Sequence, residues 1–229
     1  MFYQQFFTHL AKDGITVPKR YKEEIIQKIN ALNYIPRIGI FGKTGAGKSS
    51  LCNALYGEDI CKVSDVEACT RNIQEIFINI GEKGIRITDM PGAGESEERD
   101  NEYIKLYSFL LPEFDLILWV LKGDDRAFSS DQMFYKNIVK PHLRNGAPFF
   151  IVLNQVDKIE PFREWDYESR QPSPKQSKSI EEKCRLVAGF FEFPVSRVIA
   201  VSANEKFGLV DLVDQISGIL PKRKIVYYE

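Results

Sequence analysis

The feature that most constrains this chain is the segment at residues 42–49, which reads GKTGAGKS. It matches the pattern GxxxxGK[ST], in which glycines let backbone N–H groups converge on phosphate oxygens and the following helix offers its positive end. The apolar run IGIF precedes the segment, and Leu51, Ala54 and Leu55 follow it at helical spacing. Because this strand, loop and helix context is the one that the pattern requires, the sequence predicts a phosphate-binding loop.

Eight consecutive positions are the expected phosphate and cofactor contacts. They are Lys43, Thr44, Gly45, Ala46, Gly47, Lys48, Ser49 and Ser50. We expect Lys48 to reach the β- and γ-phosphate oxygens of a nucleoside triphosphate, and the Ser49 hydroxyl to bind Mg²⁺. The alternative is a glycine-rich turn that holds no ligand.

Two later segments bear on the magnesium ion and the γ-phosphate. The string DMPG ends an expected strand, where Asp89 can hold a magnesium-bound water while the Gly92 N–H turns toward the γ-phosphate. Thr70 is the only threonine between residues 50 and 87. A threonine that binds Mg²⁺ and senses the γ-phosphate would be an order–disorder switch, and a solvated loop threonine is the alternative. The predicted catalytic residues are Lys48, Thr70 and Gly92, and the predicted metal contacts are Ser49, Thr70 and Asp89.

Two further segments are expected to select the base of the nucleotide. NQVD at residues 154–157 follows an apolar strand, and the Asp157 carboxylate can accept hydrogen bonds from N1 and N2 of guanine. Adenine offers no such pair of donors, so the wrong base would leave a buried carboxylate unpaired. A later SAN string is expected to donate a backbone N–H to guanine O6. The predicted ligand is therefore GTP or GDP, held at its base by Asn154, Gln155, Asp157, Ser202, Ala203 and Asn204.

Apolar runs of strand length alternate with segments of helical period from residue 35 onward. The expected strands are 36–41, 73–80, 84–89, 114–121, 148–153 and 197–201. The expected helices lie near 48–56, 97–110, 130–143, 178–190 and 208–219. This order predicts an α/β fold, a three-layer P-loop NTPase G domain with a mostly parallel sheet and helices on both faces. Residues 73–89 are expected to form an antiparallel edge hairpin.

We expect an N-terminal helical extension at residues 1–34, a nucleotide-binding domain at 35–221 and a C-terminal tail at 222–229. The apolar stripe at 2–10 would either dock on the domain or contact a membrane or a partner. Residues 161–178 are rich in Pro, Ser and charge, and we expect a surface loop or a partner-recognition element there. The tail could form a last strand or none.

Composition excludes several classes of protein. With 31 basic and 32 acidic residues the net charge is −1, so any nucleic acid or anionic membrane must be met through a local patch. The four cysteines form no CxxC pair, which makes reduced thiols and a cytoplasmic location the plain expectation. No apolar run approaches the roughly 20 residues of a transmembrane helix, and the first ten residues do not read as a secretory signal.

These segments together resemble the signatures of translation-factor-related GTPases, and within them the Era-like branch, over about residues 35–220. The longer strings GKTGAGKSSLCNAL, VSDVEACTRNIQ, DMPGAGESEERD and FDLILWVLKGDDRA are similar to the bacterial GTPases of the YfjP and YeeP type, grouped as 50S ribosome-binding GTPases. The resemblance implies GTP and Mg²⁺ as cofactors, GTPase activity, and a switch that changes its affinity for a partner.

Three positions depart from the family pattern. Ala93 stands where Ras-like proteins carry the glutamine that orients water, so we expect slow intrinsic hydrolysis. Gly45 replaces the asparagine of potassium-activated relatives, which puts potassium activation in doubt, and Gln155 replaces the lysine of NKxD, which would lower nucleotide affinity. Arg71 and Arg126 are candidate arginine fingers, although solvated or acid-paired arginines are commoner near switches.

Two classes of function stay open. In the first, the switch surface at residues 63–71 and 92–100 engages an unknown protein, ribosomal or RNA-bearing effector, although no KH-like module or basic stripe is present. In the second, GTP controls assembly, including a nucleotide-dependent homodimer, as in septins or immunity-related GTPases. An ATP-using kinase is disfavoured because Asp157 would then have no role.

Overall fold

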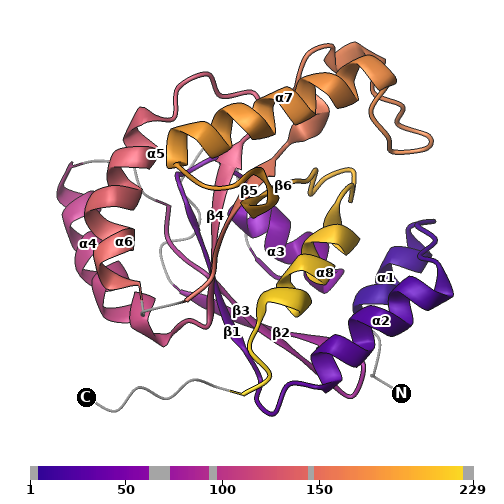
Figure 1. Cartoon of the computed structure of the whole chain (residues 1–229), viewed down its shortest axis with the longest axis horizontal. Coiled ribbons are helices and arrows are strands. Elements are labelled where there is room, and N and C mark those ends of the chain that lie inside the picture. Colours follow the sequence, from indigo (N-terminus) through magenta and orange to yellow (C-terminus); the bar gives the residue numbers. More distant parts are fainter. Residues whose placement is uncertain (1–4, 62–72, 93–96, 144–146, 224–229) are drawn as a thin grey trace.

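The computed structural model describes residues 5–61, 73–92, 97–143 and 147–223. Its centre is a six-stranded sheet in the order β2-β3-β1-β4-β5-β6 (Figure 1). The strands are β1 (Arg37–Gly42), β2 (Gln74–Ile80), β3 (Lys83–Asp89), β4 (Leu116–Lys122), β5 (Phe149–Asn154) and β6 (Val198–Ala200). Only β2 runs antiparallel to its neighbour, so the predicted mostly parallel sheet with an edge hairpin is confirmed.

Residue type follows the position of each strand in the sheet. Every residue of β5 and all but the last of β4 are buried, as expected for central parallel strands that are covered on both faces. The edge strand β2 instead alternates, because Glu75 and Phe77 are exposed whereas Ile76 and Ile78 are buried. The period of the sequence thus distinguishes the centre of the sheet from its edge.

Helices cover both faces of the sheet and complete the three layers (Figure 1). One face packs against α1 (Gln5–Lys12), α2 (Lys19–Asn30), α3 (Lys48–Tyr56) and α8 (Leu209–Ile219). The other face packs against α4 (Glu97–Leu110), α5 (Ser129–Phe134) and α7 (Pro174–Phe191), and the short α6 (Lys140–His142) lies on the same side (Figure 1). None of the described helices is long and apolar enough to cross a membrane.

The two N-terminal helices pack on the domain. Phe6, Phe7 and Leu10 of α1 are buried in the same cluster as the sheet residues Ile38 and Ile40. Helix α2 lies against α8, where Tyr21 and Lys28 contact acidic side chains, Lys28 Nζ lying 2.6 Å from Asp214 Oδ1. The described part of the N-terminal stripe is therefore covered by this chain, while residues 1–4 lie outside the described structure.

Two expected helices differ from the structure in detail. The helix expected at 130–143 spans Ser129–His142, but a π-helical turn at Tyr135–Val139 interrupts it two residues before Pro141, which has no N–H to continue the ladder. Helix α7 starts at Pro174, inside the expected loop at 161–178, because Ser173 caps it by accepting a hydrogen bond from the Gln176 N–H at 3.1 Å. Ser173 and Pro174 form a helix start signal that the predicted boundary did not use.

The parallel strands bring the predicted site together. In the sheet register Asp89 lies beside Ile40 of β1, and Asn154 lies beside Lys122 at the end of β4. The carboxyl ends of β1, β3, β4 and β5 therefore meet at one edge, which is where ligands bind in open α/β sheets.

Candidate nucleotide-binding site

The loop between β1 and α3 has the conformation that a phosphate-binding loop needs. Gly47 comes directly before the first residue of α3 and has a φ of 87°. A Cβ atom at Gly47 would lie 2.3 Å from Asn154 Nδ2, so a side chain there is excluded by space as well as by backbone strain. The glycine thus lets the loop approach the segment that follows β5.

Lys48 and Ser49 begin α3 at the same edge. The Lys48 side chain is 6% exposed, and its Nζ donates to the Lys43 carbonyl at 3.0 Å. Ser49 Oγ donates to Asp89 Oδ2 at 2.7 Å. Hydroxyl and carboxylate oxygens are ligands that Mg²⁺ accepts, so the pair predicted for the metal is brought together and its chemistry fits that ion.

Gly92 packs directly on the phosphate loop. A Cβ atom at Gly92 would lie 2.4 Å from Thr44 Oγ1 and 2.7 Å from the Thr44 nitrogen. The preceding backbone is fixed because the Met90 N–H donates to the Ile40 carbonyl at 3.1 Å, and the Tyr107 hydroxyl donates to the Pro91 carbonyl. Only glycine fits here without a shift of one loop. Gly92, the predicted γ-phosphate contact, therefore lies against Thr44, a predicted contact of the phosphate loop.

Asn154 ties three loops together. Its Nδ2 donates to the Ala46 carbonyl at 3.0 Å and to the Gly47 carbonyl at 3.3 Å, while its Oδ1 accepts from the Ala203 N–H at 3.1 Å. The segment with Ser202 and Ala203 is closed by backbone hydrogen bonds between Ser202 and Phe207, each 3.1 Å. The predicted phosphate and base segments are thus parts of one hydrogen-bonded assembly.

Gln155 supports the phosphate loop with an amide. Its Nε2 donates to the Gly45 carbonyl at 3.2 Å, and its Oε1 accepts from Lys158 Nζ at 2.8 Å. Gln155, which replaces the lysine of NKxD, therefore still contacts the phosphate loop through its side chain. A lysine ammonium is present three residues further on, at Lys158.

The Asp157 carboxylate has a buried oxygen that lacks a hydrogen-bond donor in the described part of the chain. The residue is 7% exposed, and its Oδ1 is buried with no hydrogen-bond partner among the described residues. Gln176 of α7 fixes the turn around it, since its Nε2 donates to the carbonyls of Asp157 at 3.1 Å and Ile159 at 2.9 Å. A buried carboxylate oxygen without a donor is costly, and a ligand that supplies one removes the cost.

The structure does not show a site contact for every predicted residue. Thr70, Arg71 and Ala93 fall outside the described residues. Ser50 is half-buried on α3, and Asn204 and Arg126 are exposed.

An ion pair beside the phosphate loop was missed in the sequence. Lys43 Nζ lies 2.6 Å from Asp131 Oδ2, and Asp131 is 2% exposed at the start of α5. Trp119 Nε1 donates to the other carboxylate oxygen at 3.4 Å. Burial raises the pKa of the Asp131 carboxyl, and the Lys43 ammonium opposes that shift. No local pattern pairs these residues, because they meet only through the fold.

The family is decided by comparison with known proteins. The model of a family described as 50S ribosome-binding GTPase matches residues 37–155. This chain belongs to that GTPase family. Its enzyme class is therefore GTP hydrolase, and guanine nucleotides are its ligands, as the sequence predicted.

Relatives and solved structures agree with this assignment. YfjP of Escherichia coli is 43% identical over 207 residues, which cover 90% of this chain and 70% of that protein, and YkfA is 42% identical with the same coverage. A structure of Aquifex aeolicus Era bound to GDP·AlF₄⁻ matches with a TM-score of 0.67 at 25% identity. The match covers 82% of this chain but 57% of that Era chain, so the likeness concerns only part of Era.

We predict that Lys43→Met lowers the free energy of unfolding by about 3 kcal/mol, because the buried Asp131 carboxylate would lose its cation. The double variant K43M/D131N should regain at least half of that loss in urea unfolding. Lys136→Met is the matched control, since it breaks an exposed pair with Glu192 and should cost under about 0.5 kcal/mol. Equal costs for Lys43→Met and Lys136→Met would contradict the prediction.

Proposed function

We propose that this chain binds GTP and GDP with Mg²⁺ at the loop of residues 43–50 and hydrolyses GTP slowly, so that its nucleotide state acts as a switch. The observation that carries the choice of base is the buried Asp157 oxygen without a hydrogen-bond donor. Guanine offers two adjacent N–H donors to such a carboxylate, and adenine offers none. The Ala203 N–H already donates to Asn154, so we assign the contact with guanine O6 to the Asn204 backbone.

The remaining residues would hold the phosphates and stabilise the charge that develops on them. Lys48, which donates to the Lys43 carbonyl, would exchange that acceptor for β- and γ-phosphate oxygens. Ser49 and Asp89 would hold Mg²⁺, with Thr70 proposed as a further contact. When bound, Mg²⁺ would neutralise charge on the transferred phosphoryl group, and the Gly92 N–H would donate to a γ-phosphate oxygen.

We retain three further expectations as proposals. Residues 1–34 serve as an extension to the GTPase domain at 35–221, followed by a tail at 222–229. A cytoplasmic location agrees with the free thiols of Cys52, Cys61 and Cys184. A nucleotide-dependent homodimer stays a prediction.

Asp157→Asn tests the choice of base. The change removes charge-assisted hydrogen bonds worth about 1.5–3 kcal/mol each, so GDP affinity should fall by about 10²–10⁴-fold in a titration with labelled nucleotide. Xanthosine diphosphate carries a carbonyl where guanine has its N2 amine, and the new amide can donate to that oxygen, so its binding should improve. Asp166→Asn, at an exposed carboxylate that only caps its own turn, is the control. Unchanged GDP affinity in D157N would refute the assignment.

Slow hydrolysis is the second expected property. Because Ala93 offers no amide to orient water, we expect turnover of GTP by the isolated chain on the order of 10⁻⁴–10⁻³ s⁻¹, the range of an unassisted small GTPase. Gly45 in place of asparagine predicts the same rate in potassium as in sodium. A single-turnover assay measures both, with Lys48→Ala as the inactive control. Turnover faster than about 1 s⁻¹ would show that the chain positions water by other groups.

The partner proposed is the large ribosomal subunit. The family description supports it. We expect the nucleotide-sensitive contact at residues 63–71 and 92–100, of which 63–71 and 93–96 lie outside the described residues. Cosedimentation with 50S subunits should be stronger with a non-hydrolysable GTP analogue than with GDP. Pelleting that is absent, or equal in both states, would exclude this partner for the switch.

A further inference from the structure

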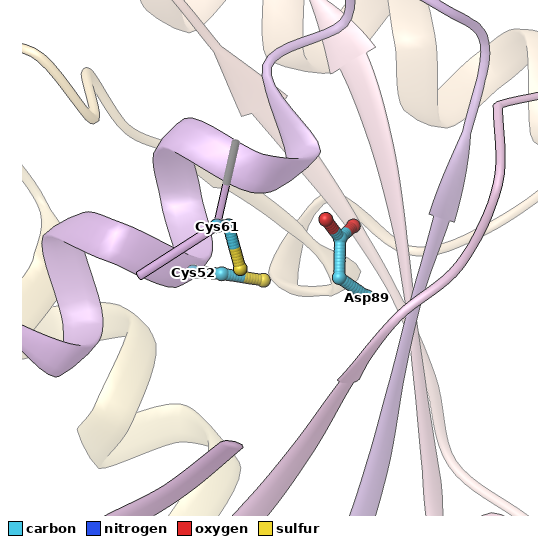
Figure 2. A group of neighbouring side chains, drawn as sticks. All are labelled: Cys52, Cys61 and Asp89. Atoms are coloured by element: carbon cyan, nitrogen blue, oxygen red, sulfur yellow. The ribbon is translucent and has the colours of Figure 1, made fainter. Parts of the chain in front are cut away.

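Two thiols and a carboxylate meet beneath the proposed magnesium site. Cys52 lies on α3, Cys61 follows that helix, and Asp89 ends β3. Their sulfur and oxygen ligand atoms all lie within 4.8 Å of one another, and all three residues are buried. Figure 2 shows the two sulfur atoms close together, with the Asp89 carboxylate next to them. The Cys52 and Cys61 thiols hydrogen-bond to each other, so the two sulfur atoms already share one site.

The position of Cys61 is fixed by a neighbouring amide. Asn53 Nδ2 donates to the Cys61 carbonyl at 2.9 Å, and the Cys61 N–H donates to Asn53 Oδ1 at 2.7 Å. Asn53 directly follows Cys52 on α3, so these two bonds hold the Cys61 backbone next to the turn of helix that carries Cys52. The Asp89 carboxylate is also held in place, because Ser49 Oγ donates to its Oδ2 at 2.7 Å. The cluster is thus built before any ion enters it.

The ligand set selects a class of cation. Thiolate sulfur favours borderline or soft metals, whereas Mg²⁺ and Ca²⁺ prefer oxygen alone. Zinc takes sulfur at about 2.3 Å and carboxylate oxygen at about 2.0–2.2 Å, so the ligands of a tetrahedral zinc lie about 3.4–3.8 Å apart. Groups within 4.8 Å of one another reach that geometry with side-chain shifts of about 1 Å. Three protein ligands leave one position for water.

We propose that Cys52, Cys61 and Asp89 form a binding site for a thiophilic divalent cation, with zinc as the ion that fits it best. Because Asp89 is also the carboxylate assigned to Mg²⁺, an ion held by the two thiols draws this carboxylate away from Ser49. Zinc would then oppose magnesium-dependent nucleotide binding. This second step rests on the proposed function, whereas the zinc site itself does not.

Zinc binding is measured first, on nucleotide-free full-length chain in which Cys69 and Cys184 are replaced by serine. This background leaves Cys52 and Cys61 as the only thiols. Titration with Zn²⁺ against a chromophoric chelator should give one ion per chain, bound as tightly as by the unmodified chain, and zinc should protect both thiols from alkylation. No binding, or binding that leaves both thiols reactive, would overturn the site.

Two single variants assign the ligands. Cys52→Ala and Cys61→Ala in the same background should each weaken zinc binding by at least about 100-fold, the upper end for loss of even an outer-shell partner. Urea unfolding without metal establishes that each variant is folded, and Cys61→Ala, which lies outside α3, keeps the test open if Cys52→Ala is unstable. Folded variants that bind zinc like their background would overturn the proposal.

The coupling to nucleotide is measured last. Zinc should lower the apparent affinity of the background protein for GDP in magnesium buffer by at least about 10-fold, and it should have no effect on the Cys61→Ala variant. If zinc binds but GDP affinity is unchanged, the shared role of Asp89 is wrong while the site stands. If GDP fails to bind in magnesium buffer free of zinc, the proposed function fails, and the zinc titration is unaffected.

Discussion

The side chain of Asn154 is the contact on which the rest of the site depends. Strand β4 separates β1 from β5 in the sheet, so no strand pairing links their loops directly. The Asn154 amide makes that link, with hydrogen bonds to the carbonyls of Ala46 and Gly47 and from the Ala203 N–H. The residue is 1% exposed, so each of these bonds is protected from water. One amide therefore holds the phosphate loop at a fixed distance from the segments that we propose to choose the base.

Two buried carboxylates divide the chemistry of this site. Asp89 is paired with the Ser49 hydroxyl at the end of a strand that lies next to β1, and we propose that it serves the phosphate and metal side. Asp157 lies beyond β5 and keeps one oxygen without a donor among the described residues. A buried acceptor without a donor lowers the stability of the fold, and binding-site groups that await a ligand commonly carry such a cost. Strands β1 and β4 lie between the ends of β3 and β5, and this separation of the two carboxylates fits the proposed ligand, with phosphates at one end and a base at the other.

The sequence was informative where structure is set locally. The apolar runs of β4 and β5, the alternation of β2 and the glycines of the phosphate loop each predicted their elements within two residues. The sequence did not predict contacts between residues that are far apart along the chain. The Lys43–Asp131 pair and the cluster of Cys52, Cys61 and Asp89 join segments that only the sheet brings together. The early start of α7 at Pro174 was a missed local signal, since Ser173 and Pro174 form an ordinary helix start.

The central claim is that this edge of the sheet is a guanine nucleotide site. Calorimetric titration of the purified chain with GDP and with ADP, each in magnesium buffer, tests it most directly. The account predicts one GDP per chain and an affinity for ADP about 10⁴-fold weaker, because adenine leaves the buried Asp157 oxygen without a donor. ADP binding as tight as GDP binding, or no binding of either nucleotide, would contradict it.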